Sequence, residues 1–296
     1  MKTREFVEKW CRGFRLALCL LVFSSICFLG IAPPVHAKHG NECAQESLRG
    51  SYGYVFSGLQ FPSAPSAVGA GPVAAAGLFV FDGEGGLIAQ DTFNNGVMIS
   101  HRTGAGTYTV DSDCTGSAQL GGGFASFSFY FVIVSREREF SLLVTNPGTL
   151  QPGVAIATGD EECTLASFKG AYRNTRQDYT VPFFSVVNAG LEVGTFDGKG
   201  TVFFPPVTQS RNGVFANPTA TGTYTVSSNC IATLDLLIVD GATSVHRHRE
   251  GVIVDGGNQA LFVGATGPGG VGGVGTAQFK KRFLHGENEE RERSQH

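Results

Sequence analysis

The stretch GTYTVDSDC at residues 106–114 returns almost unchanged as GTYTVSSNC at residues 222–230, 116 positions later. The likeness extends upstream, because each copy first carries a cysteine, a Ser-x-x-Gly-x-Tyr motif, a Phe-Asp-Gly-x-Gly motif and an Asn-Gly pair in the same order. Self-similarity at this period is typical of a duplicated structural unit. We therefore divide the chain into a first copy at residues 43–160 and a second copy at residues 161–284.

Within a copy the apolar residues repeat with a period of two, as in Tyr52, Tyr54 and Phe56, which is the period of a β-strand. Asp-Gly and Asn-Gly pairs between these runs suit tight hairpin turns. The first copy is predicted to form eight strands, at residues 51–58, 73–81, 86–94, 97–110, 115–121, 125–134, 139–145 and 153–158. Closure of such a sheet removes its unpaired edges. We predict an all-β protein made of two tandem antiparallel up-and-down β-barrels of about eight strands each.

The two ends of the chain differ in composition from the copies. Residues 1–37 combine a basic start, an apolar run and a small-residue cleavage site ending at Ala37, the pattern of a secretory signal peptide. A retained membrane anchor is the alternative, since the apolar run reaches the short limit of a span. Residues 285–296 alternate acidic and basic side chains and are predicted to be a disordered charged tail. We expect a secreted or periplasmic protein without a membrane span after cleavage.

Charge makes nucleic acid an improbable partner class. The chain has 22 Lys and Arg against 25 Asp and Glu. Cleavage after Ala37 removes five basic and two acidic side chains, which leaves an excess of six acidic ones over 259 residues. A protein that binds nucleic acid through its general charge needs the opposite balance.

Four cysteines remain after this cleavage: Cys43, Cys114, Cys163 and Cys230. Four cysteines in an exported chain suggest two disulfides. If each copy closes on itself, the pairs are Cys43–Cys114 and Cys163–Cys230. Zinc is the competing use, but the Cys-x-x-Cys spacing of many zinc sites is absent, and we predict no cofactor.

The order of these motifs, closed by a Val-Ile-Val strand at residues 132–134 and 252–254, resembles secreted bacterial proteins grouped as allene-oxide-cyclase-like, calycin-type β-barrels. The resemblance covers nearly all of the chain after residue 37. It implies an eight-stranded antiparallel barrel for each copy. The bacterial members are of unknown function, and the resemblance supplies no catalytic residue.

The copies differ on one face of their strands. The second copy has Arg176, Arg247 and Arg249 at positions where the first has phenylalanine. The simpler explanation is that Arg247 and Arg249 lie in water at the start of a strand. If this face is interior, the arginines need partners, and Glu192 or a bound carboxylate, phosphate or sulfated group would serve. In that case the second copy, rather than the first, holds the ligand pocket.

The opposite face of the same segment carries His246, His248 and Glu250 at alternate positions. Two imidazoles and a carboxylate at this spacing can bind zinc or a similar ion. A polar strand facing solvent is the simpler explanation.

These features favour an exported, non-catalytic barrel pair that binds a small anionic or amphipathic molecule or a component of the cell envelope. The alternative is a cyclase-like or isomerase-like enzyme that acts through a barrel pocket. No nucleophile signature such as Gly-x-Ser-x-Gly occurs in the sequence.

Overall fold

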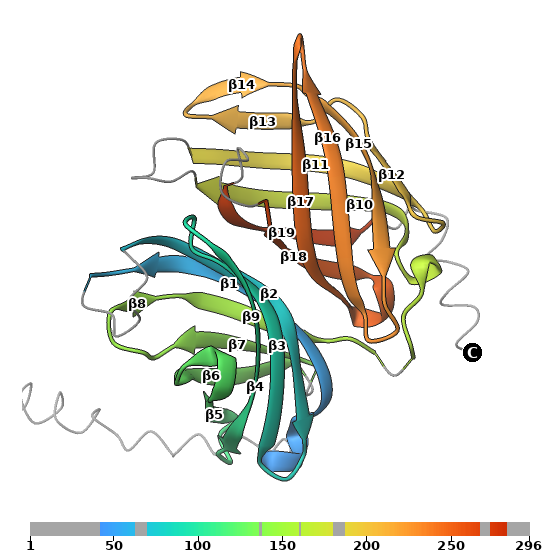
Figure 1. Cartoon of the computed structure of the whole chain (residues 1–296). Helices are drawn as coiled ribbons and strands as arrows, with labels where there is room; N and C mark the ends of the chain where they lie inside the picture. The colour runs from blue at the N-terminus through green and yellow to red at the C-terminus, as the bar shows by residue number, and fades with distance from the viewer. Residues whose placement is uncertain are drawn as a thin grey trace, which may run out of the picture. The chain divides into compact units, whose positions relative to one another are not determined.

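The computed structural model describes residues 42–62, 70–135, 138–159, 161–179, 187–266 and 273–282. The expected signal peptide and the charged tail lie outside these residues. The described residues from Cys43 onward form one compact unit. It is an all-β structure with two closed eight-stranded antiparallel barrels in tandem, as the sequence predicted (Figure 1).

The first barrel follows the chain order almost without interruption (Figure 1). It closes where β1 pairs with both β2 and β9. Two short 3-10 turns, η1 (Gln45–Ser47) and η2 (Gly122–Phe124), accompany it, and a two-residue strand, β8 (Thr149–Leu150), pairs with the end of β1. The barrel strands are β1 (Arg49–Gln60), β2 (Gly71–Asp82), β3 (Gly86–Asn94), β4 (Ile99–Val110), β5 (Thr115–Leu120), β6 (Phe127–Ser135), β7 (Glu139–Val144) and β9 (Pro152–Ala157).

The second barrel has the same strand order, but the connection between two of its neighbouring strands is interrupted by an additional hairpin. Pro205 and Pro206 interrupt the segment after β12, because proline has no backbone N–H for the ladder. The chain then forms a small hairpin, β13 (Thr208–Arg211) and β14 (Val214–Ala216), that pairs with β11. The turns are η3 (Leu165–Ser167) and η4 (Asp255–Gly257). The barrel strands are β10 (Lys169–Tyr179), β11 (Val187–Asp197), β12 (Thr201–Phe204), β15 (Thr219–Val226), β16 (Ile231–Asp240), β17 (Thr243–Val254), β18 (Gln259–Gly264) and β19 (Val274–Lys281).

The repeated GTYTV stretch forms β4 in the first barrel and β15 in the second. Each stretch ends at a cysteine with a positive φ, 69° for Cys114 and 67° for Cys230. The predicted disulfides are confirmed, with Cys43 bonded to Cys114 and Cys163 bonded to Cys230. The disulfides indicate that the protein folds in an oxidising compartment.

The Phe-Asp-Gly-x-Gly motifs form the tight turns that the sequence predicted. Asp82 Oδ1 accepts hydrogen bonds from the backbone N–H groups of Glu84 and Gly86, at 2.7 and 2.8 Å. Asp197 makes the same bonds in the second barrel. These backbone bonds hold the pKa of both exposed carboxylates below its usual value.

Aromatic rings fill the middle of each barrel in different ways. In the first, Tyr54 stacks on Phe79 with ring centroids 3.8 Å apart. In the second, the position of Phe79 is taken by Gly194, and Phe204 packs directly against that glycine. The interior of the second barrel therefore has less free space than its smaller number of aromatic residues predicted.

The barrels share an apolar cluster. Residues on the outer face of β1 and β2, among them Val55 and Ala76, belong to the same cluster as Ile253 and Val254 of β17. A side chain on Gly53 would collide with Val254, so this glycine permits the close approach. No described helix has the length and apolar character of a membrane span.

Candidate functional site

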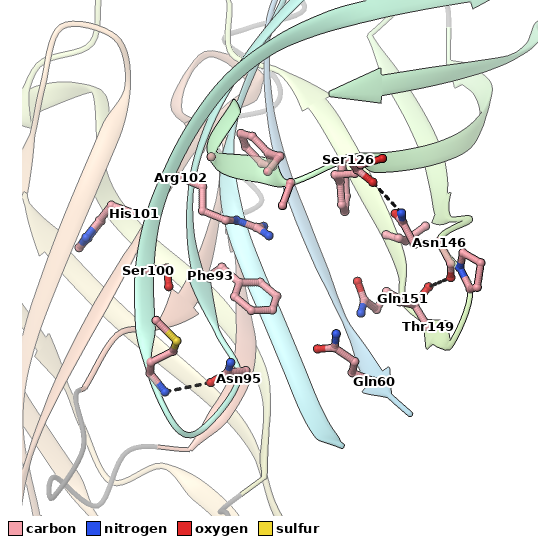
Figure 2. A pocket seen from close by; sticks show the side chains of 17 residues that line it. Gln60, Phe93, Asn95, Ser100, His101, Arg102, Ser126, Asn146, Thr149 and Gln151 are labelled. Carbon is pink, nitrogen blue, oxygen red and sulfur yellow. Dashed lines mark hydrogen bonds between the residues drawn. The ribbon is translucent and has the colours of Figure 1, made fainter. Parts of the chain in front are cut away.

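A cavity of about 370 Å³ lies at one end of the first barrel. Its wall comes from the ends of several strands, so residues far apart in sequence face one another. Figure 2 shows Arg102 and Phe93 pointing into it from β4 and β3, with Gln60 and Gln151 on the other side. A cavity of this size is in the range that holds small ligands.

Arg102 is fixed in the cavity wall by a buried carboxylate. Its Nε and Nη2 donate hydrogen bonds to the two oxygens of Asp91, at 2.8 and 2.5 Å. Tyr54 donates a further bond of 2.7 Å to Asp91 Oδ2. This leaves Nη1 as the guanidinium nitrogen that can meet a ligand.

Aromatic rings also contact the guanidinium of Arg102. Its carbon lies 4.2 Å from the ring centre of Phe93 and 4.8 Å from that of Phe124, within the range of a cation–π contact. Burial works against the charge, but the bonds to Asp91 outweigh it and raise the pKa of Arg102. Burial and the Asp91 charge raise the pKa of Tyr54 far above its usual value. Tyr54 is therefore a neutral donor, and Arg102 a permanent cation.

Amides make up the rest of the polar lining. Gln60, Asn95 and Gln151 are 6, 5 and 4 % exposed and come from three different segments of the wall. Asn95 Oδ1 accepts bonds from the backbone N–H groups of Val97 and Met98. Its Nδ2 is buried and has no hydrogen-bond partner among the described residues. A ligand acceptor in the cavity would satisfy this donor.

The sequence reasoning did not identify this site. It compared only the aromatic positions of the two copies and so expected the pocket in the second. The available signal was a charged residue at an inward strand position, since Arg102 lies two residues from Gly104 on the inner face of β4, which also carries buried Tyr108.

The arginine face of the second copy is interior, which corrects the expectation that it lies in water. Arg249 is only 6 % exposed. Arg176 donates to Glu192, at 2.6 Å from Nε to Oε1, and Arg249 Nη2 lies 3.5 Å from Asp178 Oδ2. The spaces beside them are cavities of about 20 and 40 Å³, far smaller than the cavity of the first barrel. Ligand binding by Arg176, Glu192, Arg247 and Arg249 stays a prediction.

The opposite face of β17 brings only part of the predicted metal triplet together. His248 lies between two carboxylates, with Nδ1 2.7 Å from Asp235 and Nε2 3.2 Å from Glu250, whereas His246 is exposed. Glu250 also accepts bonds from Thr92 and His101 of the first barrel.

The pKa values on this face follow from those bonds. The bond to Glu250 is the main cause that raises the pKa of His248 to about 9, with burial opposing it and Asp235 adding to it. The bond to His248 lowers the pKa of Glu250 to about 2 against burial. The described residues contain no group of three side chains placed to hold a metal ion, and metal binding stays a prediction.

The chain matches no family model and no curated protein.

Proposed function

We propose that the protein is an exported, non-catalytic binding protein whose first barrel holds a small amphipathic molecule. The observation that carries the proposal is the cavity of about 370 Å³ with one rigid cation in its wall. Phe93, Phe124 and Phe127 supply apolar surface for the body of a ligand. Arg102 Nη1 and Asn95 Nδ2 supply donors for its polar head.

The charge of the site narrows the ligand class. Asp91 already balances Arg102, so the cavity does not require a full negative charge from the ligand. A head with hydrogen-bond acceptors is enough, and both neutral and acidic amphiphiles fit this description. The strong commitment of Asp91 and Tyr54 to each other and to Arg102 leaves them unsuited to proton transfer, which favours binding over catalysis.

The test is a ligand screen on the mature chain, residues 38–296. A panel of medium-chain fatty acids, fatty alcohols and phenols would be scored by thermal unfolding and by displacement of the dye anilinonaphthalenesulfonate. A ligand at one hundred times its Kd stabilises by about 2.7 kcal/mol, which raises the unfolding temperature by several degrees.

A matched pair of variants assigns the binding to the cavity. Ser100 lines the cavity from β4, and Ser100→Phe would fill part of it. Thr103 lies on the outer, exposed face of the same strand, so Thr103→Phe adds the same ring outside. Binding should weaken at least tenfold in Ser100→Phe only. Equal affinity of both variants for every ligand found would contradict the proposal.

Two finer parts of the proposal rest on the sequence. Export through a signal peptide cleaved after Ala37 is supported by residues 1–37 and agrees with the two disulfides. The resemblance to allene-oxide-cyclase-like, calycin-type barrels is supported by the order of the repeated motifs and agrees with the observed barrels.

A further inference from the structure

Charged side chains gather at one end of the second barrel. Its inward arginines come from β10 and β17, and β13 adds another at the rim. Among the described residues these charged side chains are the buried or half-buried Arg176, Arg247, Arg249, Asp178, Glu192 and Asp240, together with Arg211, which is exposed. The guanidinium N–H groups that are buried within this group need acceptors.

Each guanidinium nitrogen of Arg176 donates to a neighbouring side chain. Its Nε donates to Glu192 at 2.6 Å, its Nη1 to Asp178 at 2.8 Å and its Nη2 to Gln209 at 2.6 Å. Both oxygens of Glu192 are in use, because Asn174 donates to the second one at 2.9 Å. These acceptors are therefore largely committed before the other arginines are considered.

Arg247 and Arg249 are not satisfied in the same way. The Nη1 atom of each is buried and has no hydrogen-bond partner among the described residues. Arg249 has one long contact of 3.5 Å to Asp178. A buried guanidinium N–H without an acceptor is costly, so the arrangement is missing at least one acceptor.

The two cavities beside these atoms differ in what they offer. The cavity of about 20 Å³ has Arg249 and Asn174 in its wall, and the unpartnered atoms there are a donor and an acceptor, Arg249 Nη1 and Asn174 Oδ1. One water can bridge such a pair. The cavity of about 40 Å³ is lined by Arg176, Arg211 and Arg247, with Asp240 as its carboxylate. Its charge favours an anion over a water.

We infer that the cavity of about 40 Å³ in the second barrel binds a small monovalent anion against Arg247. A halide or a small oxyanion such as nitrate fits this volume, and the wall of the cavity offers it three arginines against one carboxylate. The anion accepts the hydrogen bond that Arg247 Nη1 lacks. This site is separate from the amphiphile cavity of the first barrel.

The pKa of Arg247 agrees with a site that favours an anion. This pKa is lowered to about 10 by burial, with the attraction of Asp178 opposing this and the charges of Arg249, Arg176 and Arg211 adding to it. A bound anion would offset this repulsion.

The test measures thermal unfolding of the mature chain at fixed pH and ionic strength. Sodium gluconate is the background salt, because gluconate is too large for the cavity, and it is replaced stepwise by chloride, bromide or nitrate. We expect a saturating rise in the unfolding temperature of about 2 °C or more. A preference for halides would indicate a spherical site and a preference for nitrate an oxyanion site, and both support the inference. No response to any of the three would overturn it and leave water as the occupant.

Two variants test whether the anions act at this cavity. Arg247→Met removes the unsatisfied donor and should abolish the response without lowering stability in gluconate, because it also removes a buried charge. Arg173→Met on the exposed face of β10 is the matched control and should respond like the parent protein. A response that survives in Arg247→Met would show that the anions act elsewhere and would sink the inference.

A direct measurement keeps the test independent of how well the variant folds. Crystals of the parent protein grown in sodium bromide should show an anomalous bromide peak in the cavity within hydrogen-bond distance of Arg247. A cavity without such a peak at several hundred millimolar bromide would contradict the inference.

Discussion

At the scale of single residues, Asp91 carries a charge inside the first barrel with no exposed side-chain surface. Arg102 and Tyr54 together satisfy it with three hydrogen bonds. Replacing both members of such a buried ion pair by apolar residues of the same size changes the stability little, but removing one member leaves the other as an unpaired buried charge. The pair therefore fixes the wall of the cavity more than it stabilises the barrel.

The cost of leaving Asp91 without Arg102 can be predicted. Arg102→Met should lower the free energy of unfolding by about 3–5 kcal/mol, because Asp91 loses its counter-ion in a buried position. The double variant Asp91→Leu with Arg102→Met should recover most of the loss. Urea unfolding measures both, with Arg173→Met as an exposed control that should change by about 0.5 kcal/mol or less. A loss below about 1 kcal/mol for Arg102→Met would show that the pair is not buried as described.

At the scale of strands, the period of two and the turn residues located almost every element. The eight predicted strands of the first copy correspond to the eight barrel strands, with ends that differ by one or two residues. The repeat also placed the disulfides. The additional hairpin in the second barrel was missed although Pro205 and Pro206 are visible in the sequence. The cavity was missed because its volume depends on how residues from four separate stretches of the sequence pack, which no strand pattern contains.

The hydrogen bonds between His248 and the carboxylates of Asp235 and Glu250 predict that the stability of the protein depends on pH. The raised pKa of His248, about 9 against 6.5, means that its stabilisation is complete below about pH 6.5 and is lost as pH rises to about 9. The lowered pKa of Glu250, about 2 against 4.5, means that its stabilisation is complete above about pH 4.5 and is lost as pH falls towards 2. The charged groups facing His248 are Asp235 and Glu250, and Glu250 also meets His101.

The measurement compares the parent protein with His248→Gln by urea unfolding at pH 6, 7.5 and 9. The stability difference between them should be largest at pH 6 and shrink towards pH 9. His246→Gln, which changes an exposed imidazole two residues away on β17, is the control and should lack this trend. A difference that stays constant with pH would refute the assignment to His248.

At the scale of the whole molecule, the strands that join the barrels do not alternate in burial. In β2 the residues from Pro72 to Phe79 are all buried, and in β18 those from Ala260 to Gly264 are. One face of these strands packs inside its own barrel, and the other belongs to the cluster that the barrels share. Uninterrupted buried runs of this kind are typical of strands that are covered on both faces. The sequence therefore contained an indication of the contact between the barrels, which a comparison of the two copies does not reveal.

The shared cluster changes what we expect of the separated copies. Each of the segments 38–160 and 161–284 has its own strands and its own disulfide, so we predict that each folds on its own. Each half alone would expose an apolar face, which typically drives association. Mixed in equal amounts, the halves should form a 1:1 complex on size-exclusion chromatography with light scattering. Gly53→Leu in the first half should prevent it, because its side chain would meet Val252 and Val254, whereas Gly121→Leu, where an added Cβ makes only an ordinary contact of 3.8 Å with the backbone oxygen of Ala105, should not. Halves that remain monomeric when mixed would show that the cluster is too weak to hold the barrels together without the covalent link.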